Sequence, residues 1–180
     1  MRLNCPIKRR MAQKGQLIEL KLIFCRGENI GKTTFLFSFF RGKLSLHLEE
    51  SLKGENLFRK ELIDVSQLLS NYAIKIWDIA GDEQFHGIFP IFTEFMDGIV
   101  LIIGKNDRID QTIEKWVTKI NKFFTTKTPR YLIGLQKDDE YFDPAHLNEM
   151  KIKFNFDDLF ILNASYSIEI RNSFKYICLC

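Results

Sequence analysis

Residues 26–34, Arg-Gly-Glu-Asn-Ile-Gly-Lys-Thr-Thr, separate a predicted strand at 17–25 from a predicted helix at 32–40. At such a junction, consecutive backbone N–H groups cradle phosphate oxygens, and the start of the helix adds positive potential. Gly31 allows the backbone to approach closely, Lys32 reaches the outer phosphates, and the hydroxyl of Thr33 binds Mg²⁺. The segment therefore predicts a phosphate-binding loop. Its predicted nucleotide contacts are Glu28, Asn29, Ile30, Gly31, Lys32, Thr33 and Thr34.

The first position of this loop departs from the usual pattern. GxxxxGK[ST] calls for glycine where Arg26 stands, and Gly27 comes one residue late. The Arg26 side chain either points away from the loop or lies over the phosphates as a built-in cation. The first interpretation is favoured, because the end of the strand gives the side chain no evident direction. An ordinary strand–turn–helix junction that contains Gly-Lys-Thr is the structural alternative.

A second segment suited to phosphate sensing is 76–85, Ile-Trp-Asp-Ile-Ala-Gly-Asp-Glu-Gln-Phe, at the end of another predicted strand. Asp78 is placed to hold Mg²⁺ through water. Gly81, three residues later, offers its N–H to a terminal phosphate. Ligands of open α/β sheets bind at such strand ends, so this segment and the phosphate loop are expected to face one site.

The rest of the chain alternates between strand and helix patterns. The region 41–55 is polar and predicted to be loop. An α/β fold follows, with a doubly wound, six-stranded, mostly parallel sheet, one antiparallel hairpin and about five helices. Further strands are predicted at 56–65, 73–77, 98–104, 131–135 and 160–162, and further helices before Pro90 and at 108–124, 144–152 and 168–179.

Composition limits the protein class. The chain has 180 residues, of which 46% are hydrophobic and 27% charged, with a formal net charge of +3. This suits one globular domain over 17–180 after a basic arm at 1–16, and the charge is too small to predict a nucleic-acid binder. The longest clean apolar run, 99–103, is too short to span a membrane. The expected location is therefore cytoplasmic.

The second segment carries a family resemblance. Trp-Asp-Ile-Ala-Gly-Asp-Glu-Gln-Phe (77–85) resembles the WDxAGQExF string of the Ras superfamily of small GTPases, and 97–102 and 105–108 are similar to strings of Rab-like and Arf-like members. The resemblance covers about 17–179 and implies a three-layer P-loop NTPase fold. It also implies a molecular switch that binds GTP or GDP with Mg²⁺ and meets effectors, GTPase-activating proteins and exchange proteins.

The resemblance locates a base-recognition segment at 134–139, Gly-Leu-Gln-Lys-Asp-Asp, where Rho-like members carry TQxD. Asp138 would accept the N1 and N2 hydrogens of guanine, which adenine does not offer as a pair. Gln136 would lie along the base plane. Leu135 replaces a polar residue that braces the loop. An alternative register gives the recognition role to Asp139.

Two further positions come from the resemblance. The SAK loop of the family falls at Ser165 and Tyr166, where a backbone N–H would meet the guanine O6. The effector-loop threonine has no counterpart between Thr34 and Thr93, and Ser51 stands at the family's distance from Thr33. The predicted metal ligands are therefore Thr33, Ser51 and Asp78, with Ser45 as the alternative to Ser51.

Hydrolysis is expected to be slow. Asp82 occupies the position where the family has the glutamine that orients the attacking water. Its side chain is shorter and negatively charged, close to anionic phosphates. Catalysis is assigned to Lys32, Gly81 and Asp82, with help from a partner in trans left open. The alternatives are a pseudo-GTPase interaction module with weak or no nucleotide binding and, more remotely, an ATP-using P-loop enzyme.

The ends of the chain allow two interpretations. Cys178-Leu179-Cys180 resembles the doubly prenylated tail of Rab-like proteins, but the cysteines follow directly on a predicted helix, so an ordinary helix end is favoured. The basic arm with Cys5 offers contact with an anionic membrane, against the simpler interpretation of a solvated tail.

Overall fold

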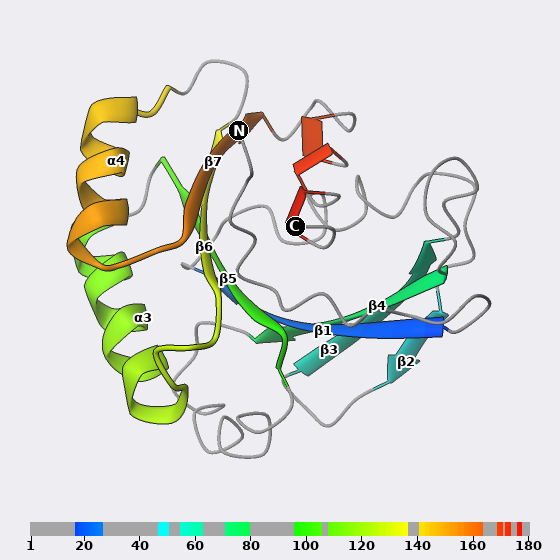
Figure 1. Cartoon of the computed structure of the whole chain (residues 1–180). Helices are drawn as coiled ribbons and strands as arrows, with labels where there is room; N and C mark the ends of the chain where they lie inside the picture. The colour runs from blue at the N-terminus through cyan, green and yellow to red at the C-terminus, as the bar shows by residue number, and fades with distance from the viewer. Residues whose placement is uncertain are drawn as a thin grey trace, which may run out of the picture.

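The computed structural model describes residues 17–26, 47–50, 55–62, 71–79, 96–105, 108–136 and 141–163, together with 169–170, 172–173 and 176–177. These residues build an α/β fold in which one twisted sheet carries helices on its faces (Figure 1). α3 and α4 cover one face of the sheet, and the helical residues near the C-terminus lie against the other.

Seven strands form the sheet, in the order β2-β3-β4-β1-β5-β6-β7. The five strands from β4 to β7 in this order run parallel, while β2–β3 and β3–β4 pair antiparallel. The mostly parallel sheet and the hairpin are thus confirmed. The strands are β1 Leu17–Arg26, β2 His47–Glu50, β3 Glu55–Leu62, β4 Asn71–Ile79, β5 Gly98–Gly104, β6 Arg130–Gln136 and β7 Asp158–Asn163.

The strand count of six was wrong, because β2 lies inside the stretch 41–55 that was predicted as loop. β2 has four residues, His-Leu-Glu-Glu, of which one is apolar. So short a run shows no alternation, which is the signal that identifies a half-buried strand. Its pairing with β3, from His47 opposite Arg59 to Glu50 opposite Asn56, creates a second antiparallel pair at the edge of the sheet.

Two helices are described in full, α3 Ile109–Phe123 and α4 Pro144–Lys153. α4 begins with proline in its first turn after Asp143, whose Oδ1 accepts a 2.9 Å hydrogen bond from the Ala145 N–H. This satisfies one of the free N–H groups of the first turn. The helices predicted at 32–40 and before Pro90 lie outside the described residues. Of 168–179, residues 169–170, 172–173 and 176–177 are helical.

The main core lies between the sheet and α3 and α4. α3 contributes side chains at a spacing of three and four residues, which places them on one face of the helix. β1 and β5 contribute alternate residues from the same face of the sheet. This core includes Ile23, Cys25, Ile99, Leu101, Ile103, Ile113, Trp116, Val117, Ile120, Leu132 and Leu147. On the opposite face, the Phe160 ring of β7 meets the Tyr176 ring edge-on at 5.6 Å and ties the C-terminal segment to the sheet.

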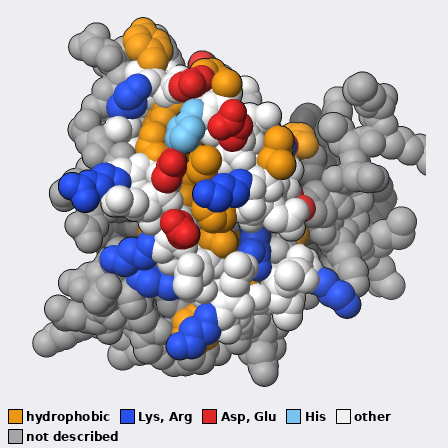
Figure 2. All heavy atoms as spheres, turned by 90° about the vertical axis from the view of Figure 1, so that its left-hand side faces the viewer, with side chains coloured by type: hydrophobic (Ala, Val, Ile, Leu, Met, Phe, Trp, Pro, Cys, Tyr) orange, Lys and Arg blue, Asp and Glu red, His pale blue; other side chains and the backbone are white. Residues whose placement is uncertain are grey.

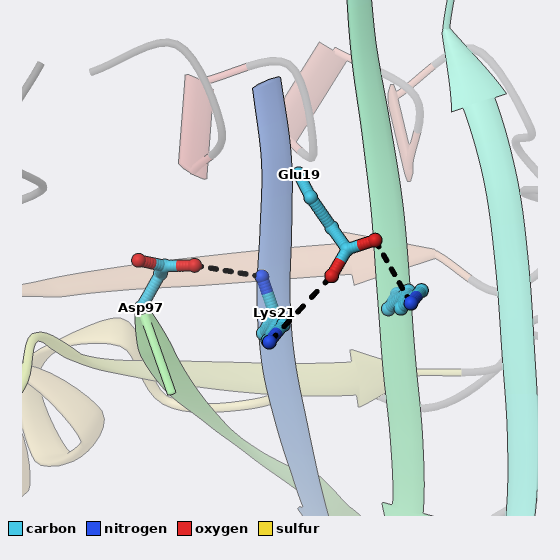
Figure 3. A network of polar contacts seen from close by, with 4 residues as sticks. Glu19, Lys21 and Asp97 are labelled. Atoms are coloured by element: carbon cyan, nitrogen blue, oxygen red, sulfur yellow. Dashed lines mark hydrogen bonds and ion pairs between the residues drawn. The ribbon is translucent and has the colours of Figure 1, made fainter. Parts of the chain in front are cut away.

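A polar network joins β1, β4 and the start of β5 (Figure 3). The Asp97 carboxylate accepts a 2.9 Å hydrogen bond from the backbone N–H of Lys21. The Glu19 carboxylate lies 2.8 Å from the Lys75 ammonium and 3.6 Å from that of Lys21. Lys21 and Lys75 are register partners, so like charges stand opposite each other across the ladder. Glu19 offsets their repulsion, and the hydrogen bond from Lys75 lowers the pKa of Glu19.

Glu19→Gln is expected to reduce the free energy of unfolding at pH 7 by about 0.5–1 kcal/mol, because the pair is partly exposed. The pKa of Glu19 in the folded chain lies below its ordinary 4.5, so the contribution is present above that pH. It is lost as the pH falls through the folded pKa. Urea unfolding at pH 7 and pH 3.5 checks this, with the exposed Glu114→Gln as control. An equal difference between Glu19→Gln and the native chain at both pH values would contradict the assignment.

Arg130, at the start of β6, is buried with 5% of its surface exposed. Its Nη1 donates a 2.5 Å hydrogen bond to Asn121 Oδ1 on α3, while Nε and Nη2 have no hydrogen-bond partner among the described residues. Burial lowers the pKa of the guanidinium, and the Asp157 charge acts in the opposite direction. The Asp157 carboxylate also accepts the Arg130 N–H at 2.7 Å. These hydrogen bonds of Arg130 therefore fix α3 and the turn before β7 to the sheet.

Candidate nucleotide-binding edge of the sheet

The carboxyl ends of the five parallel strands meet at one edge of the sheet. The register pairs Cys25 with Ile79, and Arg26 with Ile102. It also pairs Gly104 with Leu135, and Gln136 with Asn163. The segments that follow β1, β4, β5, β6 and β7 therefore all start from this edge. The phosphate loop and Ser165 follow β1 and β7, while the Asp78–Gly81 segment and the base-recognition segment begin in the last residues of β4 and β6.

The strand order also indicates where along this edge a ligand fits. β1 lies between β4 and β5, so the chain leaves β1 toward one side of the sheet and later crosses to the other. Open α/β sheets bind ligands in the crevice outside the strand ends where the strand order reverses in this way. The phosphate loop follows β1, at the reversal point. Arg26, the last residue of β1, is the residue at which the loop departs from the glycine pattern.

Two predicted site residues lie within described strands. Gln136 is the last residue of β6 and its side chain is half-buried at the site edge. Asp78 is the eighth of nine residues of β4, with its backbone in register with Phe24, so its place at a strand end is confirmed. The other predicted site residues lie outside the described residues. They are Glu28, Asn29, Ile30, Gly31, Lys32, Thr33, Thr34, Ser51, Gly81, Asp82, Asp138, Ser165 and Tyr166.

The structure adds Asn163 to the candidate site. It ends β7, is half-buried and is the register partner of Gln136. The two amide side chains therefore end adjacent strands at the edge from which the base-recognition segment and the Ser165 segment start. The available sequence signal was a polar residue closing the apolar run Leu-Phe-Ile-Leu, but only the register shows that it stands beside Gln136.

Leu135 is buried, with 5% of its surface exposed, between Gly104 and Leu162 of the neighbouring strands. Its side chain packs in the core and makes no polar brace for the segment that follows. Gly134, the residue before it, has no Cβ and lets α4 approach the sheet. A Cβ built there would lie 3.0 Å from Leu147 Cδ1 and 3.2 Å from the Phe142 ring. Packing, in place of a hydrogen bond, therefore positions the end of β6.

Gly134→Ala is expected to destabilise the chain by about 1–3 kcal/mol, because the added methyl group overpacks a filled core. Leu147 occupies that space, so the same substitution should cost less in a Leu147→Ala background. Urea unfolding of the two single variants and the double variant measures this coupling. Additive effects on the free energy of unfolding would show that the Leu147 side chain does not limit the space at Gly134. Gly98→Ala is the matched control. Its added methyl group would lie 3.1 Å from Leu22 Cδ2 on β1, so it tests a similar close contact that does not involve α4.

Beside the site edge, a hydrogen-bonding contact joins the first turns of α3 and α4. His146 Nε2 lies 2.8 Å from Asp110 Oδ1. In the view of Figure 2, a histidine and several acidic side chains gather on the upper part of the face formed by these helices. This contact holds the first turns of the two helices together. It contributes stability at a partly exposed position.

Comparison with known proteins decides the family. The model of the family described as "Ras of Complex, Roc, domain of DAPkinase" matches residues 21–139, from β1 through the base-recognition segment. The chain belongs to this family of Ras-like G domains. The match spans the phosphate loop, Asp78 and Gly81, and Asp138. The resemblance to the Ras superfamily is thereby confirmed.

Individual relatives match this chain at low sequence identity. The chain is 30% identical over 122 residues to mouse "Ras-related protein Rab-15", and 25% over 130 residues to bovine "Ras-related protein Rab-21". These alignments cover 67% and 72% of this chain, and 55% and 57% of the relatives. Human "EF-hand calcium-binding domain-containing protein 4B" is 24% identical over 121 residues, which are 67% of this chain and 16% of that protein. The chain thus matches about half of each Rab protein and a small part of the EF-hand protein.

Among the described residues, no helix is long and apolar enough to cross a membrane.

Proposed function

We propose that this G domain binds GTP and GDP with Mg²⁺ and hydrolyses GTP slowly, as a switch read by effector proteins. One observation carries the proposal: β1, β4 and β6 end at the same edge of the sheet, and each is followed by the segment suited to its part of the nucleotide. Lys32 neutralises the outer phosphates, and Asp138 selects guanine. Ser165 and Tyr166 close the base site.

Mg²⁺ would be held by oxygen donors, which are the ligands it prefers. The donor set is Thr33, Ser51 and Asp78, and Asp78 lies near the carboxyl end of β4, the strand that pairs with β1. With the ion bound, charge on the β- and γ-phosphates is neutralised. Loss of the γ-phosphate would release the segments around Ser51 and Gly81, which is the switch. GTPase-activating and exchange proteins would set the rates of hydrolysis and reloading.

The direct test is to purify the full chain in Mg²⁺ buffer, denature it and identify the released nucleotide by chromatography. Stoichiometric GTP supports tight guanine binding with slow hydrolysis. GDP supports the guanine site but leaves turnover open, because the chain can take up GDP directly. No nucleotide, together with failed titrations with GDP and a GTP analogue, would overturn the proposal.

A second candidate function, a pseudo-GTPase interaction module, rests on one observation. Leu135 is buried in the core where the family carries a polar brace, so the base-recognition segment lacks that hydrogen bond. Arg26 in place of the first glycine of the phosphate loop acts in the same direction. This candidate predicts a folded chain that binds no nucleotide in the titrations above.

Asp82→Gln tests the hydrolysis step. A glutamine there can both accept from and donate to the attacking water, and it removes a negative charge near the phosphates. One added hydrogen bond to a charged transition state, of about 1.5 kcal/mol, corresponds to about a tenfold faster reaction. Single-turnover release of phosphate from preloaded GTP is the measurement. Asp82→Asn is the control, since it removes the charge but keeps the short side chain. An unchanged rate in Asp82→Gln would show that residue 82 does not face the water.

A further inference from the structure

Tyr141 is an exposed aromatic residue just before α4, and it is not among the proposed nucleotide contacts. Its exposed fraction is 69%, whereas that of Tyr131 is 1%. Tyr176 is half-buried, and its ring meets that of Phe160 edge-on at 5.6 Å. Among the tyrosines whose side chains the structure describes, Tyr141 is therefore the one with a largely exposed ring.

The residues after Tyr141 fix the main chain beside it. Phe142 is buried, and a Cβ built on Gly134 of β6 would lie 3.2 Å from its ring. Asp143 has an extended backbone and accepts the Ala145 N–H at 2.9 Å, so α4 begins directly after it. The stretch 141–143 is neither helix nor strand. Phe142 thus anchors this stretch to the sheet while Tyr141 stays at the surface.

The sequence around Tyr141 is acidic. Residues 137–143 read Lys-Asp-Asp-Glu-Tyr-Phe-Asp, so three of the four residues before Tyr141 carry a carboxylate, and Asp143 adds a fourth. The other tyrosines of the chain have no aspartate or glutamate among the four residues before them; they are Tyr72, Tyr131, Tyr166 and Tyr176. Tyr141 therefore differs from them in the charge of its flanking sequence.

The folded surface beside Tyr141 is acidic as well. Asp110, Asp143 and Glu149 have exposed side chains at or near the first halves of α3 and α4. α4 begins at the upper end of the helical layer in Figure 1, and Figure 2 shows acidic side chains gathered on the upper part of that face. A protein that acts on Tyr141 therefore meets a negative surface and needs a positive one of its own.

From this combination of exposure and charge we propose that Tyr141 is a phosphorylation site for a protein tyrosine kinase with a basic substrate groove. Kinases discriminate among substrates by complementary charge patterns, and lysine or arginine in the groove would pair with the carboxylates at 138–140. The phenol oxygen of Tyr141 attacks the γ-phosphorus of ATP. The new O–P bond forms as the bond from this phosphorus to the β–γ bridging oxygen breaks. ADP leaves with that electron pair, and the phenol proton passes to the catalytic base of the kinase.

The consequence for the nucleotide rests on the proposed function. The phosphate adds a charge of about −1.5 to −2. Asp138 stands three residues before Tyr141, a stretch that spans at most about 11 Å, which is close to the screening length of about 8 Å at physiological salt. Repulsion by the phosphate therefore disfavours the arrangement in which Asp138 receives guanine. The positive end of α4 is equivalent to about half a charge and is outweighed by the four carboxylates.

Phosphorylation is therefore expected to speed the dissociation of GDP. A repulsion of this size between charges about 10 Å apart corresponds to about a fivefold faster release at low salt. The difference should disappear at 1 M salt, where screening shortens the reach of the field to about 3 Å.

The first test is transfer of radiolabelled phosphate from ATP to the full chain by a purified tyrosine kinase domain that phosphorylates a glutamate–tyrosine copolymer. Mass spectrometry locates the phosphate, which is expected at Tyr141. Tyr141→Phe should lose the label, whereas the matched control Tyr176→Phe should keep it, and circular dichroism should show both variants folded. Glu140→Lys should slow labelling about tenfold, because it reverses the charge beside the phenol. No labelling, equal labelling of Tyr141→Phe, or an unchanged rate in Glu140→Lys would overturn the proposal.

The second test compares the release of labelled GDP from the phosphorylated and unphosphorylated chains at low salt and at 1 M salt. Faster release from the phosphorylated chain at low salt alone supports regulation through Tyr141. Equal release at low salt would refute that regulation. Failure of both forms to bind GDP would refute the proposed function, whereas the labelling of Tyr141 does not depend on a bound nucleotide and would still support the phosphorylation site.

Discussion

Lys32→Ala is expected to purify without bound nucleotide and to bind GDP at least about a hundredfold more weakly than the native chain. The ammonium of Lys32 is assigned to the outer phosphates, and a hydrogen bond to a charged group in a closed site is worth about 3 kcal/mol. That free energy corresponds to about two powers of ten in affinity. Fluorescence titration with a labelled GDP, beside chromatography of released nucleotide, measures the loss.

The control for Lys32→Ala is Lys153→Ala, which removes an exposed lysine at the end of α4, away from the strand ends. It should keep its nucleotide. Far-ultraviolet circular dichroism should show both variants folded, which separates loss of nucleotide from loss of structure. The native chain should melt at a higher temperature as GDP is added, because a ligand that binds the folded state stabilises it, while Lys32→Ala should not respond. Nucleotide retained by Lys32→Ala would refute the phosphate-loop assignment.

The parts of the fold that the sequence predicts well are those where one physical signal dominates. β5 was predicted with its bounds because Gly98–Gly104 is an uninterrupted apolar run buried on both faces of the sheet. The start of α4 followed from Pro144, because proline is favoured in the first turn of a helix. β7 was predicted as 160–162 but extends over Asp158–Asn163, because its half-buried ends carry polar residues that interrupt the apolar signal.

The candidate site also has parts that the sequence predicts and parts that it does not. The order of its segments along the chain was readable, because each follows the end of a predicted strand. The position of Asn163 beside Gln136 could not be predicted, since the two residues are 27 positions apart and only the register of β6 with β7 brings them together. The ion pair of Glu19 with Lys75 was missed for the same reason, because the two residues are 56 positions apart and only the pairing of β1 with β4 brings them close together. Local patterns carry no information about register between distant strands.

Asp138→Asn is expected to weaken guanine binding about a hundredfold or more and to create binding of xanthine nucleotides. The carboxylate accepts both the N1 and N2 hydrogens of guanine, whereas an amide accepts one and turns an N–H toward the other. The lost bond and the unpaired donors together cost about 3 kcal/mol. Xanthine carries a carbonyl in place of the exocyclic amine, so the amide N–H meets an acceptor. Competition of GDP and xanthosine diphosphate against labelled GDP measures whether the preference changes from guanine to xanthine.

The gain of xanthine binding makes this test independent of folding, because a misfolded chain loses both nucleotides. Asp139→Asn is the matched control and also decides the register. Gly134 lies within β6 and Gln136 ends it. We proposed Asp138 for recognition because of its spacing from Gly134. If Asp139→Asn instead exchanged the preference, recognition would begin one residue later. The missing brace at Leu135 would then be the physical reason, since a segment not fixed by a hydrogen bond at its base can enter the site one residue farther along.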